Sequence, residues 1–350
     1  MRKYFYLLMT DQTHDPFSLI FKVFLKGCSL LYSLVVKIMV AGYEKGIFKR
    51  YDLGRPVISV GNITWGGVGK TPLVLWIAAY LRKKNLHPVI LTRGYMAQAG
   101  ARSDEVAMMR AALPEVPVVT NKDRVKGARY ALLNHTVDVF LLDDGFQQWR
   151  VNKDLDIVAI DATNPFGNGS LLPRGILREP LRALSRADVF VVTKCDLGND
   201  NVQQIAERLQ GMKANAPVME TVHQPVGFES LSGRKKVATD AFKGKDVAIL
   251  SSIGDPLGFE NTVISLGVQV KARFIFSDHF RYDAVHIARL LNHCQQAKVD
   301  TLLTTAKDEI KLKSFLEWPK GLEVYVLKID LHFLKGQDGF SRRVDSLLLR

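Results

Sequence analysis

The sequence predicts an α/β fold made of two Rossmann-like domains that follow an N-terminal amphipathic helix. Val- and Ile-rich strand candidates alternate with helical stretches from residue 57 onward, and strands that are apolar on both faces are typical of parallel sheets covered by helices. A glycine-rich loop follows the first of these strands. The alternation weakens over one segment and then resumes. We therefore expect an N-terminal helical segment (1–50), a first domain (51–210), a connection (211–245) and a second domain (246–350).

The composition limits the classes of protein to which the chain can belong. Its 350 residues suffice for two domains with large cores. An apolar content of 47% excludes a membrane protein with many spans. The formal net charge of +13 predicts an anionic partner, and charge alone leaves open nucleic acid, an anionic membrane or a phosphorylated substrate. The three cysteines are scattered, which predicts neither a disulfide framework nor a zinc cluster.

The N-terminal segment predicts a helix at a membrane surface. Asp15-Pro16 is a typical helix start, and residues 17–43 are strongly apolar. Three lysines fall within about 60° of one another around this helix: Lys22, Lys26 and Lys37. The longest uncharged run, Gly27–Val36, is too short to cross a bilayer, and the apolar run at Tyr4–Met9 is too short for a signal peptide. The alternative is a helix packed on the protein's own core with its lysines in water.

The two domains are expected from their strand and helix candidates. Those of the first domain are strands at 57–60, 89–92, 116–119, 137–142, 157–160 and 189–192. Those of the second domain are strands at 247–250, 269–276, 301–304 and 323–329, with helices near 256–266 and 283–297.

A glycine-rich loop after the first strand predicts a phosphate-binding site. The run is Thr64-Trp65-Gly66-Gly67-Val68-Gly69-Lys70-Thr71, and a helical stretch follows at 72–81. Strand, glycine loop, Lys-Thr and helix form the layout of a P-loop, in which backbone N–H groups and the helix N-terminus cradle a polyphosphate. Lys70 can reach the β- and γ-phosphates, and the Thr71 hydroxyl can hold Mg²⁺. Thr64 departs from the strict motif, and Trp65 stands where related loops often carry lysine.

Two further strand ends carry polar side chains. Asp143-Asp144 follows the strand at 137–142, where a carboxylate commonly serves the Mg²⁺ of a bound nucleotide. Thr193-Lys194-Cys195-Asp196 is similar to the guanine-reading motif of G proteins. The companion D-x-x-G motif is not met, because Gly145 stands only two residues after Asp143. A GTPase therefore stays an alternative.

Taken together, the motifs resemble the tetraacyldisaccharide 4′-kinases of lipid A biosynthesis. The resemblance spans residues 15–312 and rests on these runs: Ile58-Ser59-Val60-Gly61-Asn62-Ile63-Thr64, Gly66 to Pro72, Arg93-Gly94-Tyr95, Asp104-Glu105, Asp143-Asp144-Gly145-Phe146-Gln147, Phe166-Gly167-Asn168-Gly169, Leu172 to Leu181, Ile253-Gly254-Asp255-Pro256, Phe276-Ser277-Asp278-His279 and Thr304-Thr305-Ala306-Lys307-Asp308.

The resemblance implies a kinase that moves the ATP γ-phosphate to the 4′-hydroxyl of a tetraacyldisaccharide 1-phosphate, giving lipid IVA. It implies ATP and Mg²⁺, a place on the cytoplasmic face of the bacterial inner membrane, whose surface is anionic, and no nucleic-acid partner. It also implies a catalytic pair, Asp104 with His279, which we expect to meet across the two domains. Lys70 would neutralise phosphate charge. Thr71 with Asp143 or Asp144 would hold Mg²⁺, and Arg178 and Glu179 are further candidates for phosphate or metal contact.

The chain also departs from the family's pattern. The family usually has Gly-Asp-Glu-Pro where this chain has Ser103-Asp104-Glu105-Val106. It often has histidine where this chain has Phe280, and glutamate where this chain has Ala306. Two other classes stay open: a membrane-associated regulatory P-loop ATPase or GTPase, and a nucleic-acid-binding protein, which only the net charge favours.

Overall fold

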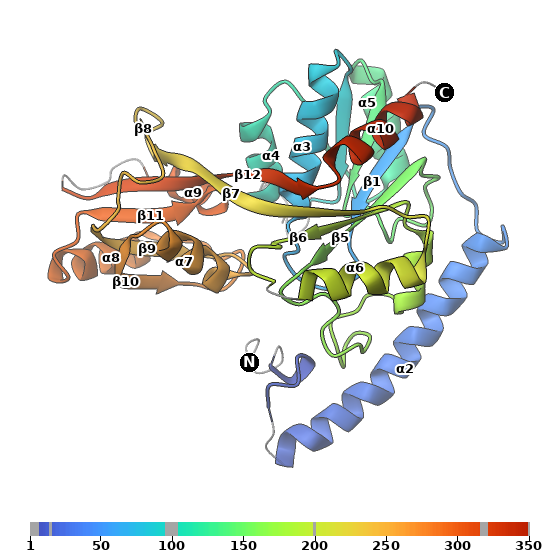
Figure 1. The fold of residues 1–350 in the computed structure, drawn as a ribbon, viewed down its shortest axis with the longest axis horizontal. Coiled ribbons are helices and arrows are strands. Elements are labelled where there is room, and N and C mark those ends of the chain that lie inside the picture. Colours follow the sequence, from blue (N-terminus) through green and yellow to red (C-terminus); the bar gives the residue numbers. More distant parts are fainter. Residues whose placement is uncertain (1–6, 14–15, 95–103, 199–200, 316–320, 349–350) are drawn as a thin grey trace. The chain divides into compact units, whose positions relative to one another are not determined.

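The computed structural model describes residues 7–13, 16–94, 104–198, 201–315 and 321–348 (Figure 1). Tyr4, Asp15, Tyr95 and Ser103, named above, lie outside these residues. The chain forms two compact units: Met1–Arg93, Leu113–Val222 and Phe333–Arg350 make up the first, and Gly94–Ala112 and His223–His332 the second. This division differs from the expected one, because residues 94–112 belong to the second unit and the C-terminal residues from Phe333 return to the first.

A parallel sheet with strand order β3-β2-β4-β1-β5-β6-β7 forms the centre of the first unit. Its strands are β1 (Val57–Gly61), β2 (Pro88–Thr92), β3 (Val118–Thr120), β4 (Val139–Asp143), β5 (Leu155–Asp161), β6 (Val189–Thr193) and the start of β7 (Val218–Ser230). Every residue of β1, β2, β4, β5 and β6 is buried, as their apolar sequences predict. The strand order reverses beside β1, and sheets of this kind bind ligands where the carboxyl ends of the strands meet such a reversal.

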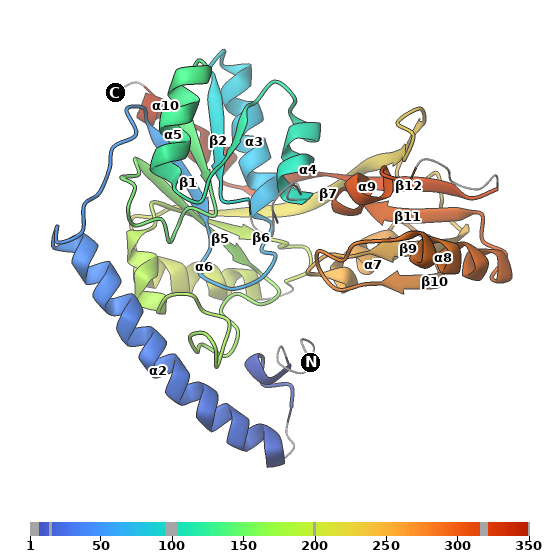
Figure 2. The same ribbon diagram turned by 180° about the vertical axis from the view of Figure 1, so that it is seen from behind.

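Helices cover both faces of this sheet (Figures 1 and 2). They are α3 (Lys70–Lys83), α5 (Arg124–Asn134), α6 (Asn201–Met212) and α10 (Gln337–Leu348), together with the short 3₁₀ helix η1 (Leu181–Arg186). One apolar cluster joins α5 to β2 and β4 around Phe140, and another joins α6 to β5 and β6 around Phe190. α10 packs on α3, with the ring centroids of Trp76 and Phe340 5.6 Å apart.

The second unit has its own run of parallel strands, in the order β10-β9-β11-β12, with the remainder of β7 beside β12. Its elements are β8 (Lys236–Val237), β9 (Asp246–Ser251), β10 (Gln269–Ile275), β11 (Thr301–Thr305), β12 (Glu323–Lys335), α4 (Asp104–Ala112), α7 (Pro256–Ser265), α8 (Ala284–Gln296) and α9 (Ala306–Leu312). The expected connection at 211–245 was wrong in one respect, because it contains the whole of the 13-residue strand β7. Polar residues such as Glu220 and His223 interrupt the apolar pattern of that strand.

The N-terminal helix α2 (Pro16–Glu44) is a continuous element of 29 residues (Figure 2). Four buried side chains fall within about 40° of one another, on the face toward the rest of the first unit: Ser18, Leu25, Ser29 and Val36. The Ser29 hydroxyl donates to the Leu171 carbonyl (2.7 Å), and the Tyr32 hydroxyl donates to the Arg178 carbonyl (2.9 Å).

The opposite face of α2 is apolar and exposed. Its large side chains include Ile20, Phe24, Leu30, Leu31, Leu34, Val35 and Ile38. This exposure contradicts the alternative of an ordinary core helix. By length and composition, Phe17–Glu44 is long and apolar enough to cross a membrane, which the uncharged run alone did not predict. The structure is therefore compatible with association of this helix with a membrane.

Candidate active site

The glycine-rich loop lies between β1 and α3, at the carboxyl edge of the first unit's sheet. Gly66 (φ 137°) and Gly69 (φ 80°) adopt left-handed backbone conformations, which explains why glycine is needed at these two positions. Neighbouring segments fix the loop: the Trp65 N–H donates to the Ile176 carbonyl (2.6 Å), and the Thr193 hydroxyl donates to the Val68 carbonyl (2.8 Å). The loop therefore leads directly into the first turn of α3, which begins at Lys70 and contains Thr71.

Lys70 lies beside oxygen atoms of two neighbouring loops. Its Nζ donates to Asn62 Oδ1 (2.9 Å) and lies 3.2 Å from Asp144 Oδ1. Asp144 has a φ of 53° and accepts hydrogen bonds from Arg178 (2.9 Å) on both carboxylate oxygens. Burial alone would raise the pKa of Asp144, but Lys70 and Arg178 together lower it to about 2. The carboxylate is thus ionised at neutral pH and balances two cations.

Asp143 is placed by contacts behind the loop. It ends β4, is buried, and accepts a hydrogen bond from the Thr92 hydroxyl on Oδ2 (2.9 Å). The buried guanidinium of Arg124 donates to the Asp143 carbonyl (3.3 Å). Thr71, Asp143 and Asp144 offer the hydroxyl and carboxylate oxygens that Mg²⁺ prefers. Among the residues that the structure describes, no group of three or more His, Cys, Asp or Glu is placed to hold a metal ion, so the fit rests on these few oxygens.

Glu179 differs from the other candidate ligands of Mg²⁺. It is fully buried, and each of its oxygens already has a partner. Oε1 accepts from Gln147 (3.2 Å), and Oε2 accepts from Arg186 (2.7 Å). In this structure, the Glu179 carboxylate is therefore a buried hydrogen-bond acceptor for the side chains of Gln147 and Arg186.

The motif similar to the guanine-reading element has contacts inside the protein. Thr193 braces the glycine-rich loop, as described above. The ammonium of Lys194 is buried and lies 2.6 Å from Asp161 Oδ2. Thr193 thus contacts the glycine-rich loop, and Lys194 contacts the end of strand β5. Neither contact favours the GTPase alternative.

The predicted catalytic pair forms within the second unit. His279 Nδ1 lies 3.4 Å from Asp104 Oδ2. The expectation that the pair would meet across two domains was wrong, because α4 packs against α9 and carries Asp104 into the unit that contains His279. Burial would raise the pKa of Asp104, but the hydrogen bond from His279 and the charge of Lys311 outweigh it and lower that pKa. Asp104 is therefore an ionised carboxylate beside an imidazole.

Two lysines near this pair were missed by the sequence analysis. Lys307 lies 2.8 Å from Asp278 and 3.9 Å from Glu105, and Lys311 lies 3.4 Å from Asp104. They stand four residues apart on α9, so they share one face of that helix, toward the acidic first turn of α4. A signal was present for Lys307, because the Thr304–Asp308 run contributed to the family resemblance without any role being assigned to its lysine. Lys311 lies outside that run.

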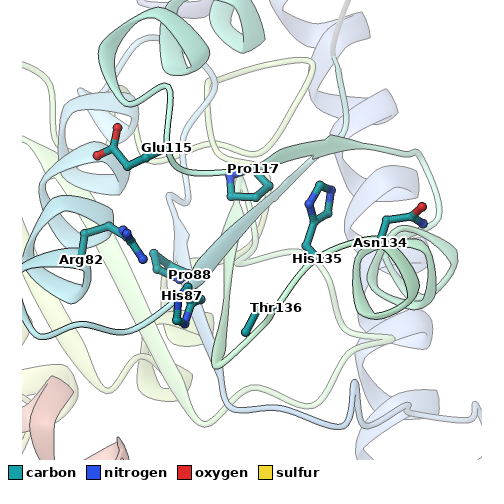
Figure 3. A pocket seen from close by; sticks show the side chains of 8 residues that line it. All are labelled: Arg82, His87, Pro88, Glu115, Pro117, Asn134, His135 and Thr136. Carbon is teal, nitrogen blue, oxygen red and sulfur yellow. The ribbon is translucent and has the colours of Figure 1, made fainter.

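A surface pocket of the first unit lies away from these residues (Figure 3). Its lining includes His87, Pro117 and Thr136, which precede β2, β3 and β4, together with Arg82, Pro88, Glu115, Asn134 and His135. It therefore lies at the amino ends of the strands, at the edge of the sheet opposite the glycine-rich loop. We do not assign it to nucleotide binding.

Comparisons with known proteins give the family of this chain and a solved relative of its fold. The family model described as tetraacyldisaccharide-1-P 4′-kinase matches residues 21–349. The tetraacyldisaccharide 4′-kinases of Desulfatibacillum aliphaticivorans and Halothermothrix orenii are 36% and 34% identical, with 89% and 87%, respectively, of both chains covered. The crystal structure of LpxK from Aquifex aeolicus in complex with ATP matches with a TM-score of 0.72 and 27% identity, covering 94% of this chain and 99% of that one. The chain belongs to the tetraacyldisaccharide-1-phosphate 4′-kinase family.

Proposed function

We propose that this chain transfers the γ-phosphoryl group of ATP to the 4′-hydroxyl of tetraacyldisaccharide 1-phosphate, forming lipid IVA. Membership of the family makes it a kinase of lipid A biosynthesis. One observation carries the assignment of residues: an ionised carboxylate, Asp104, lies beside the imidazole of His279 in a chain that also presents Lys70 at a phosphate-binding loop.

The glycine-rich loop binds the nucleotide in this proposal. Backbone N–H groups of residues 66–71 and the N-terminus of α3 hold the phosphates. Lys70 exchanges Asp144 for the β- and γ-phosphate oxygens and neutralises the charge that develops on them during transfer. Arg178 already lies beside Asp144, so it is placed to contact the same phosphates. Thr71, Asp143 and Asp144 would hold Mg²⁺, which supplies further charge neutralisation at the β- and γ-phosphates.

The Asp104–His279 pair acts on the acceptor in this proposal. The 4′-hydroxyl loses its proton to the pair as its oxygen forms a bond to the γ-phosphorus. The bond between that phosphorus and the oxygen bridging to the β-phosphate breaks, and ADP leaves with the bonding electrons. His279 orients Asp104 and shares the proton. Because both members of the pair belong to the second unit, we expect its geometry to be set without the nucleotide.

The exposed face of α2 holds the enzyme on the membrane in this proposal. An acylated disaccharide resides in a bilayer, so the kinase must work at that surface. We place α2 in the headgroup region of the cytoplasmic face of the inner membrane, with the apolar side chains inserted and Lys26 and Lys37, both exposed, near anionic lipid. The anchoring of Ser29 and Tyr32 to residues 171–178 supports this placement, because it ties the middle of the helix to the loop that precedes Glu179.

Mass analysis of the lipid product tests the proposed function. The purified protein is incubated with tetraacyldisaccharide 1-phosphate and ATP-Mg²⁺, and fragmentation locates the new phosphate. We expect one added phosphoryl group at O4′ and none with Lys70→Ala. Hydrolysis of ATP to inorganic phosphate without any phosphorylated lipid would favour a regulatory ATPase instead.

A further inference from the structure

A buried lysine joins the proposed catalytic pair to the core of the second unit. The side chain of Lys311 is only 9% exposed, and its ammonium lies 3.4 Å from Asp104 Oδ2. It donates to Ser252 Oγ (2.6 Å), lies 3.4 Å from Asp308 Oδ1, and stands over the ring of Tyr282 (5.9 Å to the centroid). A buried ammonium needs ion-pair and hydrogen-bond partners, and here it has two carboxylates. Its position is therefore defined from several sides.

Asp308 is the second carboxylate that Lys311 contacts. It is fully buried and accepts hydrogen bonds from the Ser252 N–H (3.0 Å) and hydroxyl, the Tyr282 hydroxyl (2.9 Å) and the Thr305 hydroxyl (2.8 Å). Burial and the charge of Asp308 raise the pKa of Tyr282, so the phenol stays protonated and donates. Because neutral donors already surround Asp308, this carboxylate serves as an anchor for Lys311.

We propose that Lys311 is a positioning residue for phosphoryl transfer: its anchored ammonium fixes the Asp104 carboxylate against His279 and keeps it ionised. This inference rests on the proposed role of Asp104. The closest approaches of His279 and Lys311 are both to Oδ2 of Asp104. We assign the other oxygen, Oδ1, to the substrate hydroxyl.

The charges around Asp104 support a specific effect of Lys311. The groups that face this region from the loop after β10, from α9 and from α4 are Asp278, His279, Tyr282, Lys307, Asp308, Lys311 and Glu105. Lys307 pairs with Asp278 and Glu105. Among the ion pairs of the described residues, the lysine that lies within ion-pair distance of Asp104 is Lys311. Removing its charge must therefore make Asp104 easier to protonate.

A pH profile of kcat tests the proposal. We compare Lys311→Met with wild type and with Lys313→Met, a matched control in which the exposed Lys313 loses its pairing with Glu309. The pKa of Asp104 is lowered in the folded protein, so removing Lys311 should move the acid limb of the kcat profile upward by about one pH unit. We expect kcat at neutral pH to fall about 10- to 100-fold, with KM for ATP within about twofold. The Lys313→Met control should keep the wild-type profile.

A thermal melt will show whether Lys311→Met folds. If it does not, two further variants still test the proposal. Lys311→Arg retains the charge, so its acid limb should stay near that of wild type even if kcat falls. Ser252→Ala removes the shortest contact of Lys311 but no charge, and should lower kcat a few-fold without moving the limb. A folded Lys311→Met with the wild-type acid limb, or a limb that moves equally in Lys311→Arg, would overturn the inference.

Failure of this inference is distinguishable from failure of the proposed function. Asp104→Asn is measured in the same assay. If Asp104→Asn loses transfer and Lys311→Met keeps the wild-type profile, only the role of Lys311 is wrong. If Asp104→Asn keeps wild-type transfer, the proposed base is wrong and the inference falls with it.

Discussion

The two charged sites of the molecule are held in opposite ways. In the first unit, Asp144 is 38% exposed and balances Lys70 and Arg178, cations that phosphate would also attract. In the second unit, Asp308 is fully buried and accepts several hydrogen bonds, and Lys311 lies 3.4 Å from both Asp308 and Asp104. In the proposed mechanism, the first site exchanges partners when a nucleotide binds, whereas the contact between Asp104 and His279 is formed without a substrate. On the proposed function, nucleotide binding and deprotonation of the acceptor therefore have separate structural supports.

The largest effect is expected from Lys70→Ala. Loss of a positioned cation that stabilises transition-state charge typically lowers kcat by about 10²-fold or more. Steady-state transfer to tetraacyldisaccharide 1-phosphate measures it, with a thermal melt to verify folding. Lys83→Ala, on the exposed end of the same helix, serves as the control and should retain wild-type activity. Near-normal turnover in folded Lys70→Ala would remove the glycine-rich loop from the mechanism.

The next largest effect concerns the pair in the second unit. Asp104→Ala and His279→Ala should each lower kcat strongly, and the double variant should lose little more, because residues that act as one unit are not additive. ATP affinity, measured by calorimetry, should change far less. Asp283→Ala is the control, since Asp283 forms a similar contact with His286 on the surface. Multiplicative losses in the double variant would show that the two side chains act independently.

The next prediction concerns membrane binding through α2. Substitutions on its exposed face should reduce the fraction of protein bound to vesicles without unfolding the protein. Leu30, Leu31 and Leu34 are all more than half exposed, so replacing them with serine should release the protein from anionic vesicles in a sedimentation assay. Leu133→Ser, on the exposed face of α5, should leave binding unchanged. High salt should weaken wild-type binding without abolishing it. Wild-type protein that does not sediment with the vesicles would contradict the membrane role of this helix.

The smallest effect is expected from Glu179→Gln. The substitution keeps hydrogen-bonding capacity but removes the charge that pairs with Arg186, so the free energy of unfolding should fall by about 1–2 kcal/mol in a denaturant titration. The Mg²⁺ concentration that supports half-maximal activity should stay the same. A large increase in that concentration would restore Glu179 as a metal ligand.

The sequence predicted the first site better than the second for a physical reason. The glycine-rich loop is contiguous, and its strand, loop and helix dictate one another locally, so residues 64–71 could be placed without a structure. The second site combines α4, Ser252 after β9, the loop at His279 and α9, which only tertiary packing brings together. The family resemblance identified Asp104 and His279. It could not identify the unit that holds Asp104, because residues 94–112 join the second unit through contacts between α4 and α9.

The separation of binding from deprotonation is tested most directly by measuring both on one protein, Asp104→Asn. Nucleotide affinity is obtained by calorimetry, and transfer is obtained by rapid quench with labelled ATP and tetraacyldisaccharide 1-phosphate. The account predicts an ATP Kd within about twofold of wild type and a transfer rate lowered by about 10²-fold or more. Transfer at the wild-type rate, or a loss of nucleotide binding that matches the loss of transfer, would contradict it.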